Sequence, residues 1–278
     1  MIRSPVMTVM VDAVMKAAKG LRRDFGEIEN LQVSRKGPGD FVSAADHKAE
    51  KVLRESLEKA RPDFGFVMEE SGVVEGKDSQ HRWHIDPLDG TTNFLHGIPH
   101  WAISVGLERE GTLVAGVVYD AAKDELFIAE RGKGAFVNNR RIRVSARTDM
   151  ADAVFGTGIP SLGRRDHPGF LKQVRLVMMR TAGVRRFGSA ALDLAYVAAG
   201  RMDAYWEQGL TSWDVCAGAL LVKEAGGFVG DSFGRGDAQG AARLPQAGAG
   251  GGLRRPDGPP FRGRKPVRLP PEGGFLCD

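Results

Sequence analysis

Two aspartates three residues apart, Asp86 and Asp89, mark the part of the chain best suited to chemistry. They lie in the run Trp83-His-Ile-Asp-Pro-Leu-Asp-Gly-Thr-Thr-Asn-Phe94, on a turn that follows a strand-like stretch. Carboxylates held this close repel each other, and a bound cation relieves the repulsion most simply. Because all-oxygen ligands suit a hard ion, the pair indicates Mg²⁺. Gly90-Thr91-Thr92 can open a short helix whose free N–H groups face an anion, so the segment suggests phosphate ester chemistry.

Two further acidic positions also lie at the ends of predicted elements. Glu69-Glu70 follows the apolar run Phe64–Met68, and Asp214 opens an apolar helical stretch over residues 215–225. Each has a simpler interpretation by itself: Asp-Pro and Asp-Gly are common turn dipeptides, Glu69-Glu70 suits a solvated turn, and Asp214 suits the first turn of a helix. Three acidic sites at element ends together predict a multi-metal cage.

These residues resemble the hallmark motifs of the inositol monophosphatase family. The resemblance rests on Asp86–Phe94, on Met68-Glu-Glu-Ser71, and on Trp213-Asp214 followed by Lys223-Glu-Ala-Gly-Gly227. It extends from about residue 5 to about residue 233 and is closest to the bacterial members of the family. It implies a layered α-β-α-β-α sandwich and an Mg²⁺-dependent, lithium-sensitive phosphatase that hydrolyses myo-inositol 1-phosphate.

The resemblance also implies which residues hold two or three Mg²⁺ ions. The first ion would take the Glu69 and Asp86 carboxylates and the carbonyl of Leu88. The second would take Asp86, Asp89 and Asp214, and Glu69 would help to hold a weaker third ion. Ions about 3.5–4 Å apart can activate a water and neutralise the leaving oxygen together.

The expected catalytic set is Glu69, Thr91 and Asp46. By resemblance, Thr91 and Asp46 orient and deprotonate the attacking water, and the N–H groups of Gly90 and Thr91 hold the phosphate. Asp46 closes the segment Lys36–Asp46, which also resembles the family. Its simpler interpretation is an acid in the first turn of a helix.

The expected substrate contacts come from several separate segments. They are Leu88, Asp89, Gly90, Thr91, Gly188, Ser189, Ala190, Glu207 and Asp214. Glu207 matches an acid that binds sugar-ring hydroxyls in the family, and the residues at 188–190 match a loop that lines the same pocket. The alternative for Glu207 is a rim acid without a partner.

The elements that must position these residues are of the α+β class. Apolar periodicity predicts helices at Val6–Phe25 and Ser43–Ala60. Strand-like runs with short, Gly-marked connections then predict antiparallel hairpins: Phe64–Met68, Trp83–Ile85, Ala102–Glu108, Leu113–Asp120, Glu125–Glu130 and Ala135–Val137. Beyond residue 150 strands and helices alternate: Ala153–Thr157, Gly169–Arg180, Val184–Phe187, Ser189–Gly200, Met202–Glu207, Thr211–Ala225 and Phe228–Gly230.

Composition favours a cytoplasmic enzyme. The 278 residues, 42% of them hydrophobic, can form a large core. No run approaches the ~18 apolar residues of a membrane span, and the N-terminus lacks the features of a signal peptide. Two cysteines, Cys216 and Cys277, are too few for a disulfide framework. We expect a catalytic domain over residues 1–234 with lobes at about 1–150 and 151–234, and a homodimer.

The last segment, residues 235–278, differs from the rest. It holds seven of the 14 prolines, ten of the 37 glycines and the whole net charge of +4. It shows no periodicity, so we predict a disordered tail without a strand or helix. A shifted reading frame in a GC-rich gene and a genuine basic tail both explain such a composition. The body carries 31 basic and 31 acidic residues, so no general attraction to nucleic acid follows.

Several functions remain open on the same scaffold. Histidinol-phosphatase, fructose-1,6-bisphosphatase and the nucleotidase of adenosine 3′,5′-bisphosphate would share the cage. A different class is a regulatory role through RNA polymerase or RNA, as the resemblance to bacterial members implies. The basic tail would support RNA binding, but Phe261 and Phe275 are its only aromatic residues.

Overall fold

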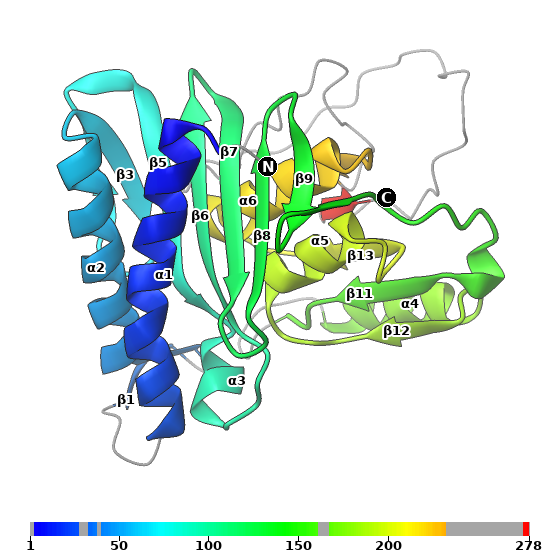
Figure 1. Ribbon diagram of the computed structural model, residues 1–278. Coiled ribbons are helices and arrows are strands. Elements are labelled where there is room, and N and C mark those ends of the chain that lie inside the picture. Colours follow the sequence, from blue (N-terminus) through cyan, green and yellow to red (C-terminus); the bar gives the residue numbers. More distant parts are fainter. Residues whose placement is uncertain (1–2, 28–32, 38–39, 161–166, 232–274, 278) are drawn as a thin grey trace, which may run out of the picture.

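The computed structural model describes residues 3–27, 33–37, 40–160, 167–231 and 275–277, and its elements stack in alternating layers (Figure 1). Helices α1 (Pro5–Gly26) and α2 (Ala44–Ala60) cover one face of a large sheet, and α5 (Ala190–Ala198) and α6 (Ser212–Glu224) cover the other. A smaller sheet follows, with α4 (His167–Met178) packed on its far face. The order α-β-α-β-α confirms the expected sandwich.

The large sheet has eight strands in the order β10-β9-β8-β7-β6-β5-β3-β4. Their bounds are β3 Phe64–Met68, β4 Gly72–Val74, β5 Asp78–Asp89, β6 Ala102–Arg109, β7 Thr112–Asp120, β8 Glu125–Glu130, β9 Gly134–Val137 and β10 Arg140–Ile142. All neighbours are antiparallel except β3 and β5. The predicted hairpins β6–β7, β7–β8 and β8–β9 are confirmed. Glu110 and Gly111 join β6 to β7 with positive φ angles of 52° and 74°, as a tight two-residue turn requires. The expected antiparallel arrangement is wrong for Phe64–Met68 and Trp83–Ile85, which pair in parallel.

The small sheet has the order β12-β11-β13-β15-β14. Its strands are β11 Val154–Thr157, β12 Gly183–Arg185, β13 Ala204–Glu207, β14 Val229–Asp231 and β15 Phe275–Cys277. Strand β13 alternates its faces: Tyr205 points to the core shared with α5 and α6, whereas Ala204 and Trp206 point to the core under α4.

Strand β15 corrects one expectation about the tail. We predicted no strand in residues 235–278, yet Phe275–Cys277 lies between β13 and β14 and is antiparallel to both. The facing edges of β13 and β14 carry backbone groups that need hydrogen-bond partners, and β15 supplies them. A run of three residues is too short to show strand periodicity in the sequence. The remaining expectation of disorder falls on residues 235–274 and 278, which lie outside the described residues.

The long helices form where the sequence predicts them. In α1 the Ser4 hydroxyl accepts a hydrogen bond from the Met7 N–H at 3.2 Å, and Pro5 occupies the first turn. In α2 the Ser43 hydroxyl caps the Ala45 N–H at 3.1 Å. Short elements complete the described part: β1 Val33–Gly37, β2 Asp40–Ser43, α3 Thr91–Leu95 and a 3₁₀ turn at Met150–Asp152.

No helix in the described part of the chain is both long and apolar enough to cross a bilayer.

Two glycines let α6 approach the large sheet closely. Gly106 of β6 and Gly116 of β7 are paired directly opposite each other. A Cβ on Gly106 would stand 2.3 Å from Cys216 Sγ, and one on Gly116 would stand 2.9 Å from the Cα of Ala217. The backbone of α6 therefore rests on a surface without side chains, and this contact sets the height of the helix over the sheet.

This contact leads to a stability prediction. Gly116→Ala should lower the free energy of unfolding by about 1–3 kcal/mol, because the new methyl group meets backbone atoms that cannot rotate away. Gly20→Ala in α1 is the matched control. Nothing lies within 4 Å of its Cβ position, so this change should stabilise the protein by up to ~1 kcal/mol. Urea unfolding of both variants measures the difference, and equal effects of the two changes would contradict the packing described here.

Candidate active site

The parallel pairing of β3 and β5 brings the first two acidic sites together. Met68 pairs with Ile85, and the Glu69 N–H donates to the Ile85 carbonyl at 3.1 Å. Because parallel strands end at the same edge, Glu69 emerges beside Asp86. The predicted convergence of these two acids is what the fold produces.

A bulge in β5 then arranges the Asp86–Asp89 segment. Asp86 pairs with Ser104 and Asp89 with Ala102, so β5 has one residue more than β6 between these pairs. Pro87 fits this break because it has no N–H to donate to the ladder. The Leu88 N–H turns back to the Asp86 carboxylate at 2.9 Å.

Asp214 reaches the same place from α6. The first turn of α6 is tied to the large sheet by Ser104, whose hydroxyl donates to the Trp213 carbonyl at 3.3 Å, and by His84, whose Nδ1 lies 3.0 Å from the Ser212 hydroxyl. The Asp214 carboxylate accepts the Thr211 N–H at 2.5 Å and the Thr211 hydroxyl at 2.8 Å. Asp214 is thus both a helix-capping acid and a member of the acidic cluster.

Asp89 joins the loop before α5 to this cluster. Its Oδ2 accepts the Ser189 hydroxyl at 2.7 Å and the Ala191 N–H at 2.6 Å. The backbone at Gly90 also approaches this loop closely, because a Cβ on Gly90 would lie 3.3 Å from the Gly188 carbonyl oxygen. The predicted loop Gly188-Ser189-Ala190 therefore borders the acidic cluster.

The four carboxylates of Glu69, Asp86, Asp89 and Asp214 concentrate negative charge at a place where Asp86 is buried and the other three acids are half-buried. Burial raises the pKa of Asp86 well above its usual range, and repulsion from the other three acids and a hydrogen bond with Glu69 add to the rise. Burial also raises the pKa of Asp89 to about 7, with Asp214 and Glu207 contributing, although the bonds from Ser189 and Ala191 oppose it. Both raised pKa values indicate that ionising all four carboxylates is unfavourable without a bound cation.

This donor set fits Mg²⁺. Its groups are carboxylate and carbonyl oxygens, the ligands that a hard divalent cation prefers, and a cation would offset the repulsion that raises these pKa values. Among the described residues, no group of three or more acidic, histidine or cysteine side chains is already arranged as a metal site. Ion binding would therefore require these carboxylates to turn toward a common point.

Asp46 and Thr91 meet at one side of the cluster. The Thr91 hydroxyl lies 3.2 Å from Asp46 Oδ1 and 3.0 Å from the Leu88 carbonyl oxygen. The other oxygen of Asp46 accepts the Ser43 N–H at 2.8 Å and the Ser43 hydroxyl at 2.6 Å. Asp46 is thus a first-turn helix acid and also a hydrogen-bond partner of Thr91. Burial raises the pKa of Asp46, and its hydrogen bonds from Ser43 and Thr91 oppose the rise.

Glu207 is the last residue of β13. The Tyr205 hydroxyl donates to its carboxylate, which lies directly over the backbone of Gly158. A Cβ on Gly158 would stand 1.8 Å from the Glu207 carboxyl carbon, so only glycine leaves room for it. Glu207 also raises the pKa of Asp89, which places it near the cluster. It is not an acid without a partner.

Some polar residues near the site were missed by the sequence analysis. Asp193 is 1% exposed, and burial raises its pKa well above the usual range, with Asp89 and Glu207 adding to the rise. Glu50 is 3% exposed and contacts the loop that carries Glu69. The sequence did offer a signal for each residue. Asp193 is an acid inside the apolar run of α5, and Glu50 is an acid one turn after Asp46 in α2.

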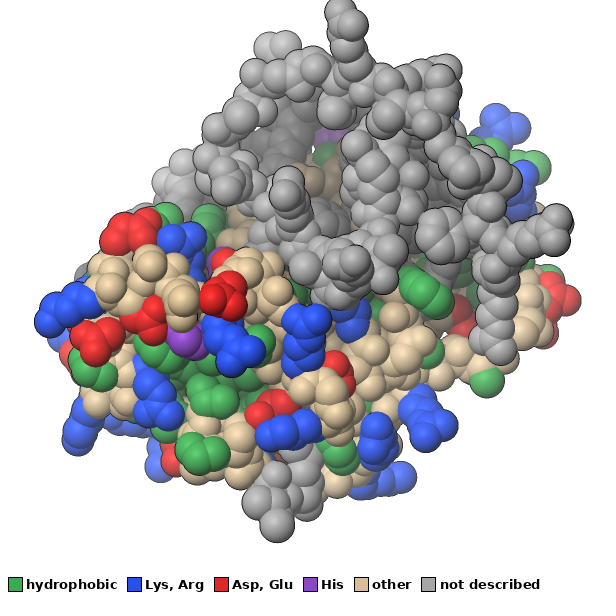
Figure 2. All heavy atoms as spheres, turned by 90° about the horizontal axis from the view of Figure 1, so that it is seen from above, with side chains coloured by type: hydrophobic (Ala, Val, Ile, Leu, Met, Phe, Trp, Pro, Cys, Tyr) green, Lys and Arg blue, Asp and Glu red, His purple; other side chains and the backbone are tan. Residues whose placement is uncertain are grey.

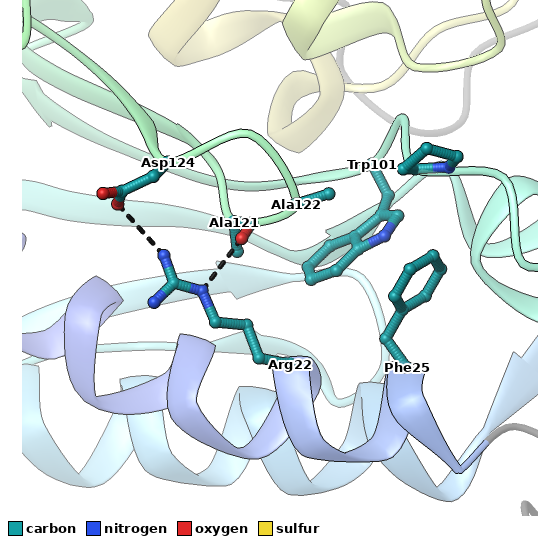
Figure 3. A pocket seen from close by; sticks show the side chains of 7 residues that line it. Arg22, Phe25, Trp101, Ala121, Ala122 and Asp124 are labelled. Atoms are coloured by element: carbon teal, nitrogen blue, oxygen red, sulfur yellow. Dashed lines mark hydrogen bonds and ion pairs between the residues drawn. The ribbon is translucent and has the colours of Figure 1, made fainter.

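A cavity in the described structure lies away from these acids (Figure 3). It has a volume of about 400 Å³ and is lined by Arg22, Phe25, Pro99, Trp101, Ala121, Ala122 and Asp124. Arg22 reaches across it, with its Nε 2.8 Å from the Ala121 carbonyl oxygen and an ion pair to Asp124 at 3.0 Å. None of the predicted site residues lines it, so we assign it no part in the chemistry.

Comparison with known proteins identifies the family. A model of the inositol monophosphatase family matches residues 2–253. The chain belongs to the inositol monophosphatase family. Its chemistry is accordingly that of a phosphatase, a hydrolase of phosphate esters. The resemblance drawn from the sequence motifs is confirmed.

Individual relatives agree with this placement. The chain is 62% identical over 234 residues to an inositol-1-monophosphatase of Mesorhizobium japonicum, covering 84% of this chain and 88% of the relative. It is 42% identical over 228 residues to a protein named Nus factor SuhB of Pasteurella multocida, covering 82% and 85%. Among solved structures, the extragenic suppressor protein SuhB of Bartonella henselae matches with a TM-score of 0.81 and 60% identity, over 82% of this chain and 88% of that one.

A buried histidine supports the loop behind Gly90. The His100 carbonyl accepts a hydrogen bond from the Asn93 amide at 2.8 Å, and the same amide nitrogen lies 2.7 Å from the Phe187 carbonyl oxygen. The His100 ring is 8% exposed, with its Nδ1 3.4 Å from the Lys123 ammonium. Burial, and then the Lys123 charge, lower the pKa of His100 to about 4.

This environment predicts how stability depends on pH. The unfolded chain takes up a proton on His100 near its usual pKa of 6.5, whereas the folded chain does so only near 4. Above pH 6.5, His100 therefore does not change the free energy of unfolding. As the pH falls from 6.5 toward 4, His100 lowers the free energy of unfolding by up to ~1.4 kcal/mol for each pH unit. His100→Gln should show a shallower loss than the wild type in urea unfolding at pH 7, 6 and 5. Parallel curves for the two proteins would contradict this assignment.

Proposed function

We propose that this protein is an Mg²⁺-dependent phosphomonoesterase that hydrolyses myo-inositol 1-phosphate to inositol and phosphate. The convergence of Glu69, Asp86, Asp89 and Asp214 carries the proposal, because four carboxylates that meet around the buried Asp86 repel one another without an ion. Membership of the family and the 62% identity to a relative named inositol-1-monophosphatase support the substrate.

The acidic residues would divide the ions among them. Glu69, Asp86 and the Leu88 carbonyl would hold one Mg²⁺, and Asp86, Asp89 and Asp214 a second, with Glu69 contributing to a weaker third. When bound, such ions neutralise the phosphate and the leaving oxygen and make water more acidic.

Thr91 and Asp46 would manage the proton of the attacking water. Their contact at 3.2 Å allows the Thr91 hydroxyl to donate to Asp46 Oδ1 while accepting a proton from the water. Asp46 then receives the proton, which its raised pKa favours. The water oxygen bonds to phosphorus and the bond from phosphorus to the ester oxygen breaks. The leaving alkoxide takes up a proton from solvent water to become the alcohol, and Asp46 returns its proton to solvent.

The remaining groups would place the substrate. The N–H groups of Gly90 and Thr91 would hold the phosphate oxygens. Ser189 and Ala190, after the turn at Gly188, would border the inositol ring, and Glu207 would accept hydrogen bonds from its hydroxyls. A neighbouring carboxylate that accepts hydrogen bonds favours a polyol over an apolar leaving group.

Other phosphatase activities remain alternatives on this scaffold. Histidinol-phosphatase, fructose-1,6-bisphosphatase and adenosine 3′,5′-bisphosphate nucleotidase would use the same acids. The bisphosphate substrates would need a second cationic cradle, for which the exposed Arg185 and Arg186 before Gly188 are the nearest candidates in sequence. A substrate panel on the purified protein with Mg²⁺ separates these activities.

A regulatory role is the second candidate, since relatives near 42% identity carry the name Nus factor. Figure 2 gives it little support on the face it shows, where Lys and Arg are mixed with Asp and Glu rather than gathered by sign. The body of the chain has equal numbers of basic and acidic residues. RNA binding that weakens steeply with salt and disappears when the seven arginines within residues 235–268 are replaced by glutamine would favour this role.

Assembly and location belong to the same proposal. We expect a homodimer in the cytoplasm. Exposed apolar side chains on and after α4, Leu171, Met178 and Met179, give a dimer surface to bury. The buried free thiol of Cys216 suits a reducing compartment. Light scattering of the purified protein measures the oligomeric state, and a monomer at micromolar concentration would contradict the expected dimer.

Two charge-removing substitutions test the acidic cluster. Asp89→Asn and Asp214→Asn should each lower phosphatase activity by orders of magnitude at saturating Mg²⁺, because each removes a ligand charge while keeping the side-chain shape. The control is Asp12→Asn, which changes an exposed acid on α1 and should leave activity unchanged. Turnover of inositol 1-phosphate by either cluster variant at the wild-type rate would exclude that residue from the site. The same assay tests the expected inhibition by millimolar Li⁺.

A further inference from the structure

Helix α2 presents two buried acids to the site on one face. Asp46 and Glu50 are four residues apart, so they lie one above the other on the helix. Asp46 contacts Thr91, and the proposed mechanism uses it. Glu50 is 3% exposed and has no part in that mechanism, although it points to the other acidic segment.

Glu50 holds the loop that carries Glu69. Its Oε2 accepts the Glu70 N–H at 2.8 Å, and its Oε1 accepts the Ser71 hydroxyl in a short hydrogen bond. Both carboxylate oxygens are therefore used, and both bonds go to the same loop. Hydrogen bonds to an ionised acceptor are stronger than neutral ones, which makes this a firm attachment.

The loop itself is short and closely defined. Met68 pairs with Gly72 across the β3–β4 hairpin, so Glu69, Glu70 and Ser71 form its three-residue connection. Gly72 has a φ angle of +73°, which closes the turn. The Glu69 N–H is bonded to the Ile85 carbonyl. Sheet pairing fixes the first loop residue, and Glu50 fixes the next two.

We propose that Glu50 is a positioning residue that holds the Glu69 loop in the conformation needed for ion binding. The proposal rests on the Mg²⁺-dependent function given above. Helix α2 thereby supports both halves of the chemistry, since Asp46 orients Thr91 and Glu50 orients Glu69.

The variant Glu50→Ala removes both attachments. The Glu70 N–H and the Ser71 hydroxyl lose their acceptor, and the loop relaxes. Supporting contacts of metal ligands typically contribute 10–100-fold to metal affinity. We therefore expect Mg²⁺ binding, measured by isothermal titration calorimetry on the full chain, to weaken by about 10–100-fold. Activity should recover at high Mg²⁺, and KM for inositol 1-phosphate should stay near the wild-type value.

The variant Glu50→Gln is the rescue. Its amide oxygen can accept the Glu70 N–H, and its amide nitrogen can donate to the Ser71 hydroxyl oxygen. We expect its Mg²⁺ affinity to stay within a few fold of the wild type. Ser71→Ala removes only one of the two contacts and should give a loss between those of the Gln and Ala variants. It keeps the test decisive if Glu50→Ala does not fold.

Glu224 provides a matched control. It also lies on a helix and accepts two loop N–H groups, those of Gly132 and Gly134, each at 2.8 Å. It is ten residues along α6 from Asp214, roughly 15 Å by the helical rise. Glu224→Ala should therefore leave Mg²⁺ affinity unchanged, even if it lowers thermal stability.

The outcomes separate the two proposals. Wild-type affinity in Glu50→Ala, or an equal loss in Glu50→Gln and Glu50→Ala, would overturn the positioning role while leaving the phosphatase proposal intact. An equal loss in Glu224→Ala would also overturn it, because the effect would then be general destabilisation. Absence of Mg²⁺ binding in the wild type would overturn the proposed function and the positioning role together.

Discussion

Repulsion among four carboxylates that meet around the buried Asp86 is the constraint on which the rest of this structure depends. Glu69, Asp86 with Asp89, and Asp214 come from three separate segments of the chain, and bringing them together is unfavourable unless a cation shares the site. The surrounding fold must therefore hold them by other contacts. Three features provide those contacts: the parallel pairing of β3 and β5, the bulge in β5, and the close packing of α6 on Gly106 and Gly116.

A network of directed hydrogen bonds completes this support from segments far apart in the chain. Ser189 and Ala191 hold Asp89, His84 holds the start of α6 through Ser212, and Glu50 holds the loop beside Glu69. Each hydrogen bond requires its polar groups to give up water, and each holds one acidic residue, or the segment that carries it, in place. These bonds fix the segments that carry the acids, and ion binding would require the carboxylates to turn toward a common point.

The sequence predicted what is encoded locally. The apolar stripe of α1, the start of α2 at Ser43 and the Gly-marked connection at Gly111 are short-range patterns. The motifs around Asp86 and Asp214 were recognised by their resemblance to the family. Contacts between distant segments left no such trace. Tertiary packing, which no local pattern reports, determines three such contacts. Strand β15 pairs between β13 and β14, the Glu207 carboxylate lies over Gly158, and Glu50 accepts a hydrogen bond from Ser71.

The central claim is that the four carboxylates bind divalent cations together, and anomalous X-ray diffraction from crystals soaked in Mn²⁺ tests it most directly. Mn²⁺ accepts the same oxygen ligands as Mg²⁺ and is visible by its anomalous scattering. The account predicts at least two anomalous peaks among Glu69, Asp86, Asp89 and Asp214, with the Leu88 carbonyl beside one of them. Crystals at saturating Mn²⁺ with no peak among these residues, or with peaks only elsewhere, would contradict it.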